Sequence, residues 1–193
     1  IETENTARGI ISTDQDDVTL NDVIIQNNLM KTLTKKNGAG IQGGATYSFV
    51  GILRMNNCLI TNNILNPVSL KDTIEGGAIY YIGAAGGLSL NNCTITNNHR
   101  RDWGVVIGAG IYYQGSIASL LPSIANCIFW NYGNGNSSGS KEIGVSQFGN
   151  QPNIQFTDVY GGFLVNGNVN FTPNFEVGED YHHTPGLFPI NSR

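Results

Sequence analysis

The chain has 193 residues, of which 12% are charged and 25 are glycine, and its formal net charge is −4. This length suffices for one domain with a substantial core, and the acidic balance argues against a surface that binds nucleic acid. No apolar run approaches the roughly 18 residues of a membrane-spanning helix, so no transmembrane segment is expected.

Four similar segments follow one another along the chain. They are VTLNDVIIQNN (18–28), LRMNNCLITNN (53–63), LSLNNCTITNN (88–98) and PSIANCIFWNY (122–132). A column of residues at intervals of 35, 35 and 34 positions runs through them: Val23, Cys58, Cys93 and Cys127. Self-similarity at such a period indicates a repeat architecture.

Each segment predicts two short strands joined by a corner. In residues 88–98 apolar residues alternate before and after Asn91–Asn92, but the two alternating pairs differ in parity. A straight strand would therefore turn one pair toward solvent. A bend at Asn91–Asn92 resolves the conflict, because asparagine tolerates the left-handed conformation of a corner. Three corner residues are expected to form an amide ladder: Asn57, Asn92 and Asn126.

The cysteine column is expected to point into the core. Adjacent parallel strands lie about 4.8 Å apart, so the thiols would stack one above another. Val23 occupies the same column in the first segment, and a buried free cysteine commonly acts as a small apolar side chain. Inert core thiols are therefore favoured over a redox or metal-binding role.

A third strand follows in each repeat. Its isoleucine column is Ile10, Ile41, Ile79, Ile111 and Ile143. Variable loops are expected before this strand, at residues 29–37, 64–75 and 99–107. Three short strands per turn, each stacked on its equivalent in the next turn, predict an all-β parallel β-helix of about five turns, each of about 32–38 residues.

The tetrapeptides GGAI (76–79) and ITNN (60–63 and 95–98), with closing segments at 126–136, 154–162, 168–175 and 180–192, resemble a known family. The chain is similar to secreted bacterial right-handed β-helix repeat proteins, including the pectate-lyase-like superfamily and the polymorphic outer-membrane proteins. The resemblance implies a right-handed parallel β-helix, exported to the bacterial cell surface or the medium. It also implies a single domain over residues 1–193, with regular turns over 9–132 and an insertion and closing turns over 133–193.

Strand alternation predicts that Tyr80 and Tyr112 point outward and stack beside the variable loops. Flat aromatic rings next to hydrogen-bonding groups suit a polysaccharide, and cations there would favour an acidic one. The candidate ligand-binding residues are Tyr80, Tyr112, Trp103, His99, Arg100, Arg101, Lys71 and Asp72. The alternative is that the tyrosines only cover the strand and the charges form a solvated loop surface.

A catalytic alternative is a polysaccharide lyase acting on an acidic glycan. Lyases of this fold use an arginine or lysine base and often Ca²⁺. Arg100, Arg101 or Lys71 could act as the base. The acidic residues nearby are few and scattered over two loops, so they would provide few ligands for Ca²⁺. TDQDD (13–17) could hold a cation, although it resembles an exposed turn, and the histidines of DYHH (180–183) would point to opposite faces.

We therefore expect a non-catalytic surface or extracellular module, with no cofactor, that binds polysaccharide or another cell-surface component as an adhesin or structural element. The exposed ends of a β-helix would also allow stacking on adjoining turns or on another copy. The lyase remains the alternative.

Overall fold

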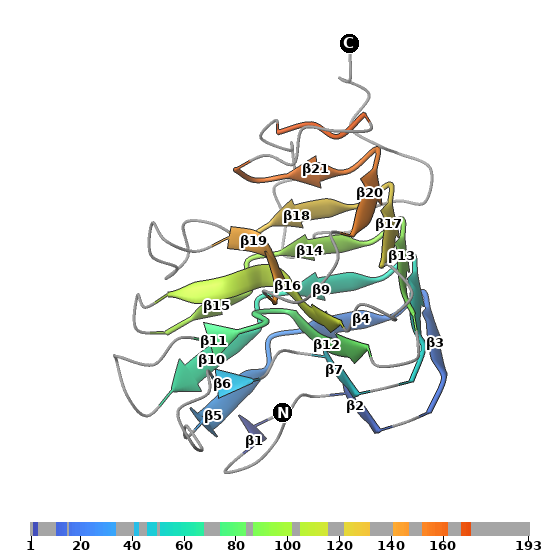
Figure 1. The fold of residues 1–193 in the computed structure, drawn as a ribbon. Helices are drawn as coiled ribbons and strands as arrows, with labels where there is room; N and C mark the ends of the chain where they lie inside the picture. Colours follow the sequence, from blue (N-terminus) through green and yellow to red (C-terminus); the bar gives the residue numbers. More distant parts are fainter. Residues whose placement is uncertain are drawn as a thin grey trace.

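The computed structural model describes residues 2–3, 11–14, 16–33, 41–42, 46–49, 51–67, 74–83, 87–101, 105–115, 122–131, 141–146, 152–161 and 167–170. Within these ranges the chain forms 21 strands and no helix, so none of the described residues forms a helix that could span a membrane. The strands pair in parallel and form four sheets, A to D. The chain is therefore a parallel β-solenoid, and its coils rise from the N-terminal to the C-terminal end (Figure 1).

Sheets C and D contain the two strands predicted around the asparagine corner. Sheet C consists of β3 (Val18–Asn21), β8 (Leu53–Asn56), β13 (Leu88–Asn91), β17 (Ser123–Ala125) and β20 (Asn153–Gln155). Sheet D consists of β4 (Ile24–Gln26), β9 (Leu59–Thr61), β14 (Thr94–Thr96), β18 (Ile128–Trp130) and β21 (Asp158–Val159). Sheets C and D each have five strands in the described residues, which fits the expected number of about five turns. We number the coils 1 to 5 by these strand pairs.

The predicted corner between the two sheets is confirmed. Asn57, Asn92 and Asn126 adopt the left-handed conformation, with φ of 55°, 53° and 56°. The corner lets Leu90 before it and Cys93 after it face the same interior, and each is 1% exposed. Asparagine adopts this conformation at lower cost than most residues, which explains its recurrence at this position.

Sheet B contains the third predicted strand. Its members are β2 (Ile11–Asp14), β6 (Ile41–Gln42), β7 (Thr46–Phe49), β11 (Ile74–Glu75), β12 (Ile79–Gly83), β16 (Val106–Gly115) and β19 (Lys141–Val145). Ile79 pairs with Ile111 and Ile111 with Ile143, as the isoleucine column predicts. The predicted place of Ile41 in this column is wrong, because Ile41 pairs with Ile74, and Thr46 is the residue beside Ile79. Within β16 the chain kinks at Gly108, which has φ +72°. A Cβ atom there would lie 2.2 Å from the carbonyl oxygen of Ile111, so the kink requires glycine.

Sheet A corrects the prediction of variable loops after the repeated segments. It consists of β1 (Glu2–Thr3), β5 (Leu29–Leu33), β10 (Ile64–Pro67) and β15 (His99–Arg100). Residues 29–33, 64–67 and 99–100 were expected to lie in loops but form paired strands. The prediction failed because these strands differ in sequence from coil to coil, so they carry no repeat signal.

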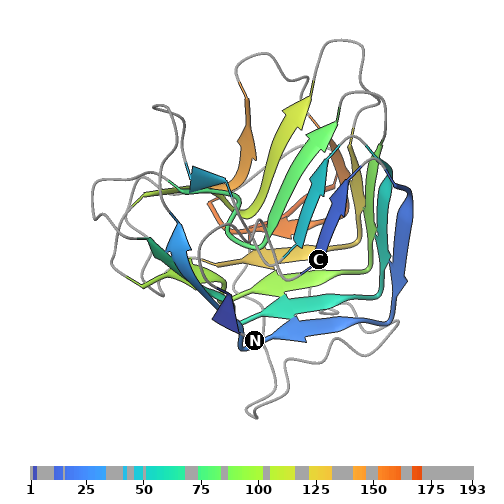
Figure 2. The ribbon, with the colours of Figure 1, turned by 90° about the horizontal axis from the view of Figure 1, so that it is seen from below.

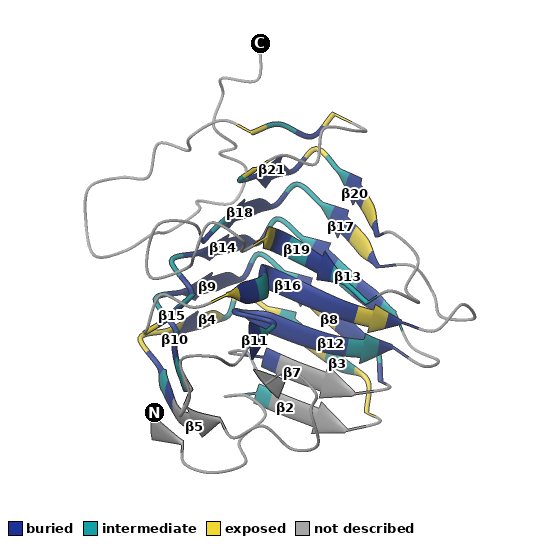
Figure 3. Cartoon of the chain, turned by 60° about the vertical axis from the view of Figure 1, so that its left-hand side comes forward, coloured by how far each residue is buried: buried dark blue, intermediate teal, exposed yellow. Residues whose placement is uncertain are grey.

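The solenoid has a main core and a second, smaller one. The main core lies between sheets B, C and D and contains the inward residues of every coil, including Cys58, Cys93 and Cys127. The second core lies in a side lobe, visible at the left of the end-on view (Figure 2). The lobe is formed by sheet A together with β11 and the first residues of β16 in sheet B. The second core contains Met30, Leu65, Ile74, Val106 and Ala109. Buried residues follow both cores along the coils (Figure 3).

A ladder of buried asparagines runs where sheet D ends and sheet A begins. We call it the asparagine ladder; it consists of Asn28, Asn63, Asn98 and Asn131. Each Nδ2 group donates to the Oδ1 atom of the next coil, at 2.8, 2.8 and 3.0 Å. The same Oδ1 atoms also accept the backbone N–H of the previous coil's asparagine. Each rung therefore satisfies polar groups from two coils without water.

The ladder was expected at Asn57, Asn92 and Asn126, and that position is wrong. Those corner residues are half-buried, and the side-chain bonds of the corner run from Asn57 to Asp22 and from Asn126 to Asn91. A left-handed corner directs its side chain toward the outside of the coil. The second asparagine of the NN exit, one residue after the next corner, points inward instead and forms the continuous ladder.

Glu142 ends the asparagine ladder at its C-terminal side. Its Oε1 atom accepts the backbone N–H of Asn131 at 2.6 Å, and its Oε2 atom accepts the Nδ2 group at 2.7 Å. Charge-assisted bonds of this length are stronger than amide–amide bonds. Glu142 is 5% exposed and belongs to β19, which contributes it to the position that the next asparagine would fill.

Replacing an inner rung should destabilise the fold far more than replacing the strand residue just before a corner. In Asn98→Ala the buried groups of Asn63 and Asn131 lose partners, so the free energy of unfolding should fall by about 3 kcal/mol or more. In Asn56→Ala only the exposed bond to Asn21 is lost, so the fall should stay below about 1 kcal/mol. Urea unfolding measures both, and equal losses would contradict the assigned role of the ladder.

Candidate functional site

Tyr80 and Tyr112 stack as predicted but are not exposed. Their ring centroids lie 5.4 Å apart with an interplanar angle of 16°. Both lie on the face of sheet B opposite to the main core, where they pack with Ile82 and Ile107. Tyr80 is 0% and Tyr112 8% exposed, so the expectation of an exposed aromatic pair is wrong. Alternation along the strand predicts that the two tyrosines point away from the main core, but it does not predict that other residues bury them.

Glu75 lies beside this buried pair and forms a hydrogen bond with the Tyr112 hydroxyl group. Burial raises the pKa of the Glu75 carboxyl group, and the bond from Tyr112 opposes that effect. Burial and then the neighbouring Glu75 charge raise the pKa of Tyr112 to about 12. The Tyr80 hydroxyl group donates to Oε1 of Gln114 at 2.9 Å. The tyrosine face therefore carries a half-buried acid held by a phenol.

The predicted cationic loop residues are only partly brought together. His99 and Arg100 form β15, where His99 is half-buried and its Nδ1 atom lies 3.0 Å from the carbonyl oxygen of Asn97. Arg101 follows the strand and is exposed. Three further predicted site residues lie outside the described residues: Lys71, Asp72 and Trp103. Their role in binding stays a prediction.

Arg100 is a buried strand residue rather than a surface cation. It continues the column of Met30 and Leu65 in sheet A, and it is 0% exposed. Its Nη1 group donates to the carbonyl oxygen of Val105 at 3.4 Å, across the side lobe. The aliphatic part of an arginine can cover an apolar cluster while its guanidinium group bonds to backbone oxygens. A base that attacks an external glycan could not use this side chain as it lies here.

The described residues contain no group of three or more histidine, cysteine or acidic side chains that could hold a metal ion. In the segment 13–17, Asp16 and Asp17 are exposed, and Oδ1 of Asp17 accepts the backbone N–H of Ile52 at 3.0 Å. The segment 180–183 lies outside the described part of the chain.

The three thiols form the predicted inward column. Cys58, Cys93 and Cys127 are free and at most 2% exposed. The hydrogen bond with Cys93 and burial raise the pKa of Cys58 far above the ordinary thiol value. The bond with Cys127 and burial raise the pKa of Cys93 to about 12. A thiol that stays protonated is a poor nucleophile and a poor metal ligand.

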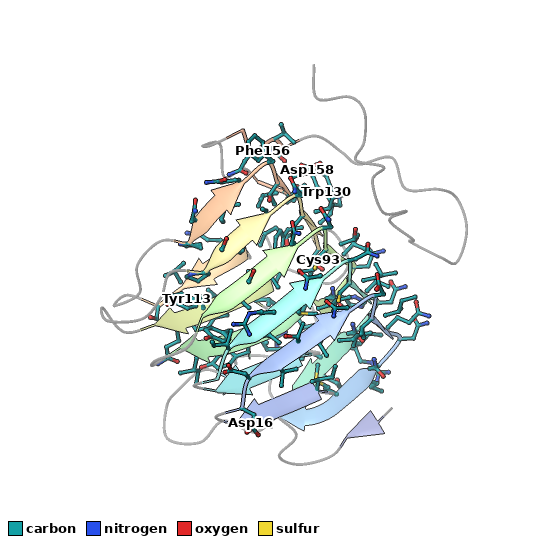
Figure 4. All side chains as sticks on the ribbon, turned by 90° about the vertical axis from the view of Figure 1, so that its right-hand side faces the viewer. Asp16, Cys93, Tyr113, Trp130, Phe156 and Asp158 are labelled. Atoms are coloured by element: carbon teal, nitrogen blue, oxygen red, sulfur yellow. The ribbon has the colours of Figure 1, made fainter. Side chains whose placement is uncertain are left out.

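Among the described residues of the last two coils, three aromatic residues are not buried; we call them the aromatic strip. They are Trp130, Phe156 and Tyr160. Phe156 is 64% exposed, and the other two are half-buried. Trp130 and Tyr160 meet edge to face, with ring centroids 4.8 Å apart. Figure 4 shows Trp130 and Phe156 near the C-terminal end of the solenoid.

Phe156 departs from the sequence pattern of the repeat. It occupies the corner position that Asn57, Asn92 and Asn126 fill in earlier coils, and it keeps their left-handed conformation with φ 49°. A bulky residue in this conformation costs about 1–2 kcal/mol relative to its preferred regions. Such strain with an exposed ring is more typical of functional than of structural positions. Aligning NIQFTDV (153–159) as a fifth repeat would have shown this phenylalanine.

Comparison of the chain with protein-family models, with curated proteins and with solved structures gives no match.

The thiols should be unreactive in the folded protein and should make its stability fall at alkaline pH. A pKa of Cys93 raised to about 12 gives stability that is complete below about pH 8.5 and declines as the pH rises toward 12. Cys93→Val, which copies Val23, should show a smaller decline than the parent chain between pH 8 and 11. Thiol labelling before and after denaturation provides the second measurement, and rapid labelling of the folded chain would contradict this assignment.

Removing the charge of Glu75 should stabilise the fold at neutral pH. Its raised pKa means that its favourable contribution is complete below the unfolded value of about 4.3 and is lost as the pH rises through the folded value. Glu75→Gln keeps an oxygen for the Tyr112 hydroxyl group, so its melting temperature should exceed that of the parent at pH 7. The two should converge below about pH 4. A less stable variant at pH 7 would show that the charged bond outweighs burial.

Proposed function

We propose that the chain is a right-handed parallel β-helix of an exported bacterial protein, and that it binds a polysaccharide without transforming it. The glycan would contact the aromatic strip formed by Trp130, Phe156 and Tyr160. This role is that of a surface or extracellular binding module, such as part of an adhesin. The sequence resemblance to secreted β-helix proteins supports the export and the hand of the coil.

The observation that carries the proposal is the exposed ring of Phe156. Packing does not require it, since the fold places asparagine at the same corner in three other coils. Its ring lies against Gly167, whose added Cβ atom would be 2.8 Å from Cδ1 of Phe156. Cδ1 and Cε1, on one side of the ring, are the atoms nearest to Gly167, and the residue as a whole remains 64% exposed. A sugar ring presents C–H groups that pack on such a ring, much as apolar groups pack on aromatic rings elsewhere.

The surroundings of the strip favour a neutral glycan. Polar amide side chains lie in coil 5 and in the residues that follow it: Asn153, Gln155 and Asn170. Nε2 of Gln155 donates to Oδ1 of Asn153 at 3.1 Å, and Oδ1 of Asn170 accepts the backbone N–H of Gly161 at 3.2 Å. Amide groups at the rim both donate and accept hydrogen bonds, as sugar hydroxyl groups require.

A second candidate is an enzyme acting on an acidic glycan, and Glu75 is the observation that favours it. A half-buried carboxyl group with a raised pKa beside a phenol is an arrangement that acid–base catalysts use. Of the predicted bases, Arg100 is buried, whereas Arg101 is exposed. This candidate would place the glycan at sheets A and B, on the side of Glu75 and Arg101.

Phe156→Asn separates binding from folding. The substitution restores the corner residue of the repeat, so the melting temperature should stay the same or rise, while the affinity for a neutral polysaccharide should fall at least about tenfold, as loss of a stacking contact of about 1.4 kcal/mol predicts. Titrations with soluble neutral and acidic polysaccharides measure the affinity. Fluorescence of Trp130 in a Trp103→Phe background reports contact at the strip.

Arg101→Ala is the matched control, because it alters an exposed residue outside the strip. It should leave the affinity unchanged. Unchanged binding in Phe156→Asn would refute the strip as the site. Loss of binding in Arg101→Ala, together with ultraviolet-absorbing unsaturated products from an acidic glycan, would establish the enzyme instead.

A further inference from the structure

The outer face of sheet C is accessible in every described coil, and Figure 4 looks onto it. Its first outward column has four exposed residues and one half-buried serine; in coil order these are Thr19, Arg54, Ser89, Ser123 and Asn153. The matching column of sheet D is covered, since Leu59, Thr94 and Ile128 are only 5%, 2% and 6% exposed. A long ligand could therefore lie on the side of sheet C.

A row of left-handed residues borders this face, where each coil passes from sheet C to sheet D. We call it the corner row; it consists of Asp22, Asn57, Asn92, Asn126 and Phe156, with φ between 49° and 56°. Adjacent parallel strands lie about 4.8 Å apart, so the row repeats a short polar side chain at this interval along the solenoid. It ends at Phe156, the exposed ring of the aromatic strip, which Figure 4 shows at the C-terminal end of the face.

The amide groups of the corner row do not saturate one another. The Nδ2 group of Asn57 donates to Asp22, and that of Asn126 donates to Oδ1 of Asn91 at the long distance of 3.5 Å. Within the described part of the chain, the side-chain amide of Asn92 forms no hydrogen bond. The inner asparagine ladder has the same spacing and is bonded at every rung. The outer amides therefore keep donors and acceptors that a ligand can use.

The spacing and the charge of the corner row fit one class of ligand. An extended β-1,4-linked glycan advances per sugar by nearly the distance that the solenoid advances per coil, so successive sugars meet equivalent side chains. In coils 3 to 5 neither the corner row nor the first outward column of sheet C carries a charge; the two charged residues, Asp22 and Arg54, belong to coils 1 and 2. Sugar hydroxyl groups donate and accept, as amides do, so a neutral glycan matches this surface.

We propose that the bound polysaccharide is an extended, neutral β-1,4-linked glycan that runs along the corner row. One sugar packs on Phe156, and the next three lie at Asn126, Asn92 and Asn57. The inference rests on the proposed function, because the glycan starts at the same ring of the aromatic strip. The amide of Asn92 donates to and accepts from the hydroxyl groups of the third sugar. The site is then four sugars long, and the affinity depends on the length of the glycan.

Oligosaccharides of two and four sugars, prepared from cellulose and from linear β-1,4-mannan, test the length of the site by calorimetric titration of the whole chain. In at least one of the two series the tetrasaccharide should bind at least about tenfold more tightly than the disaccharide, because the added sugars form hydrogen bonds at Asn92 and Asn57. A tetrasaccharide contains three overlapping disaccharides, so a site for two sugars gives a gain of only about threefold. A gain no larger than this in both series, or no binding of either tetrasaccharide, overturns the inference.

Asn92→Gly tests the contribution of the corner amide. Glycine adopts positive φ without strain, so the melting temperature should change little. The tetrasaccharide should bind about fivefold more weakly, as the loss of one hydrogen bond predicts, and the disaccharide should bind as before. The matched control is Asn62→Gly, because Asn62 is also half-buried with φ 55° but lies at the corner between sheets D and A. It should leave both affinities unchanged, and equal effects of the two variants would overturn the inference.

The failure of this inference can be told from the failure of the proposed function. If a neutral polysaccharide binds and Phe156→Asn weakens it, while Asn92→Gly has no effect or neither tetrasaccharide binds, the aromatic strip is a glycan site and the corner row does not extend it. If no polysaccharide binds the parent chain, both proposals fail.

Discussion

The asparagine ladder is the constraint on which the rest of the structure depends. It lies where each coil leaves sheet D for sheet A, a place where backbone groups from the main core and the side lobe meet away from water. An amide side chain can accept from the coil before and donate to the coil after, and Asn63 and Asn98 do both while 0% exposed. The ladder thereby holds successive coils in one register and lets the chain close two cores rather than one.

The polar ladder and the thiol column occupy the interior, so a residue at an outward position of a coil can differ from the repeat without disturbing them. A side chain that points away from the main core is not necessarily accessible to solvent or ligand. Tyr80 points away from the main core and is nevertheless buried. Phe156 shows the converse. A corner that needs only a small polar residue carries an exposed ring, so the ring is free to serve another purpose.

Features that recur in every coil could be predicted from the sequence. The strands of sheets C and D, the corner at Asn92 and the inward cysteines follow from alternation and spacing alone. The strands of sheet A could not be predicted, because one position holds Met30, Leu65 and Arg100, and the arginine breaks the apolar pattern. The ladder was assigned to the wrong asparagine because both candidates repeat, and only the backbone direction at the corner separates Asn92 from Asn98. The exposure of the tyrosines depends on contacts between distant segments, which periodicity does not contain.

The ends of the two side-chain ladders have a consequence for how such a protein changes length during evolution. The corner bonds run toward Asp22 at one end, and the asparagine ladder runs toward Glu142 at the other, and both terminal groups accept without donating. An internal coil needs no terminator, since its asparagine is both donor and acceptor. A tandem duplication of the 35 residues from 64 to 98 would therefore insert a coil that fits its neighbours, whereas copying a segment that includes Glu142 would place a stop inside the array.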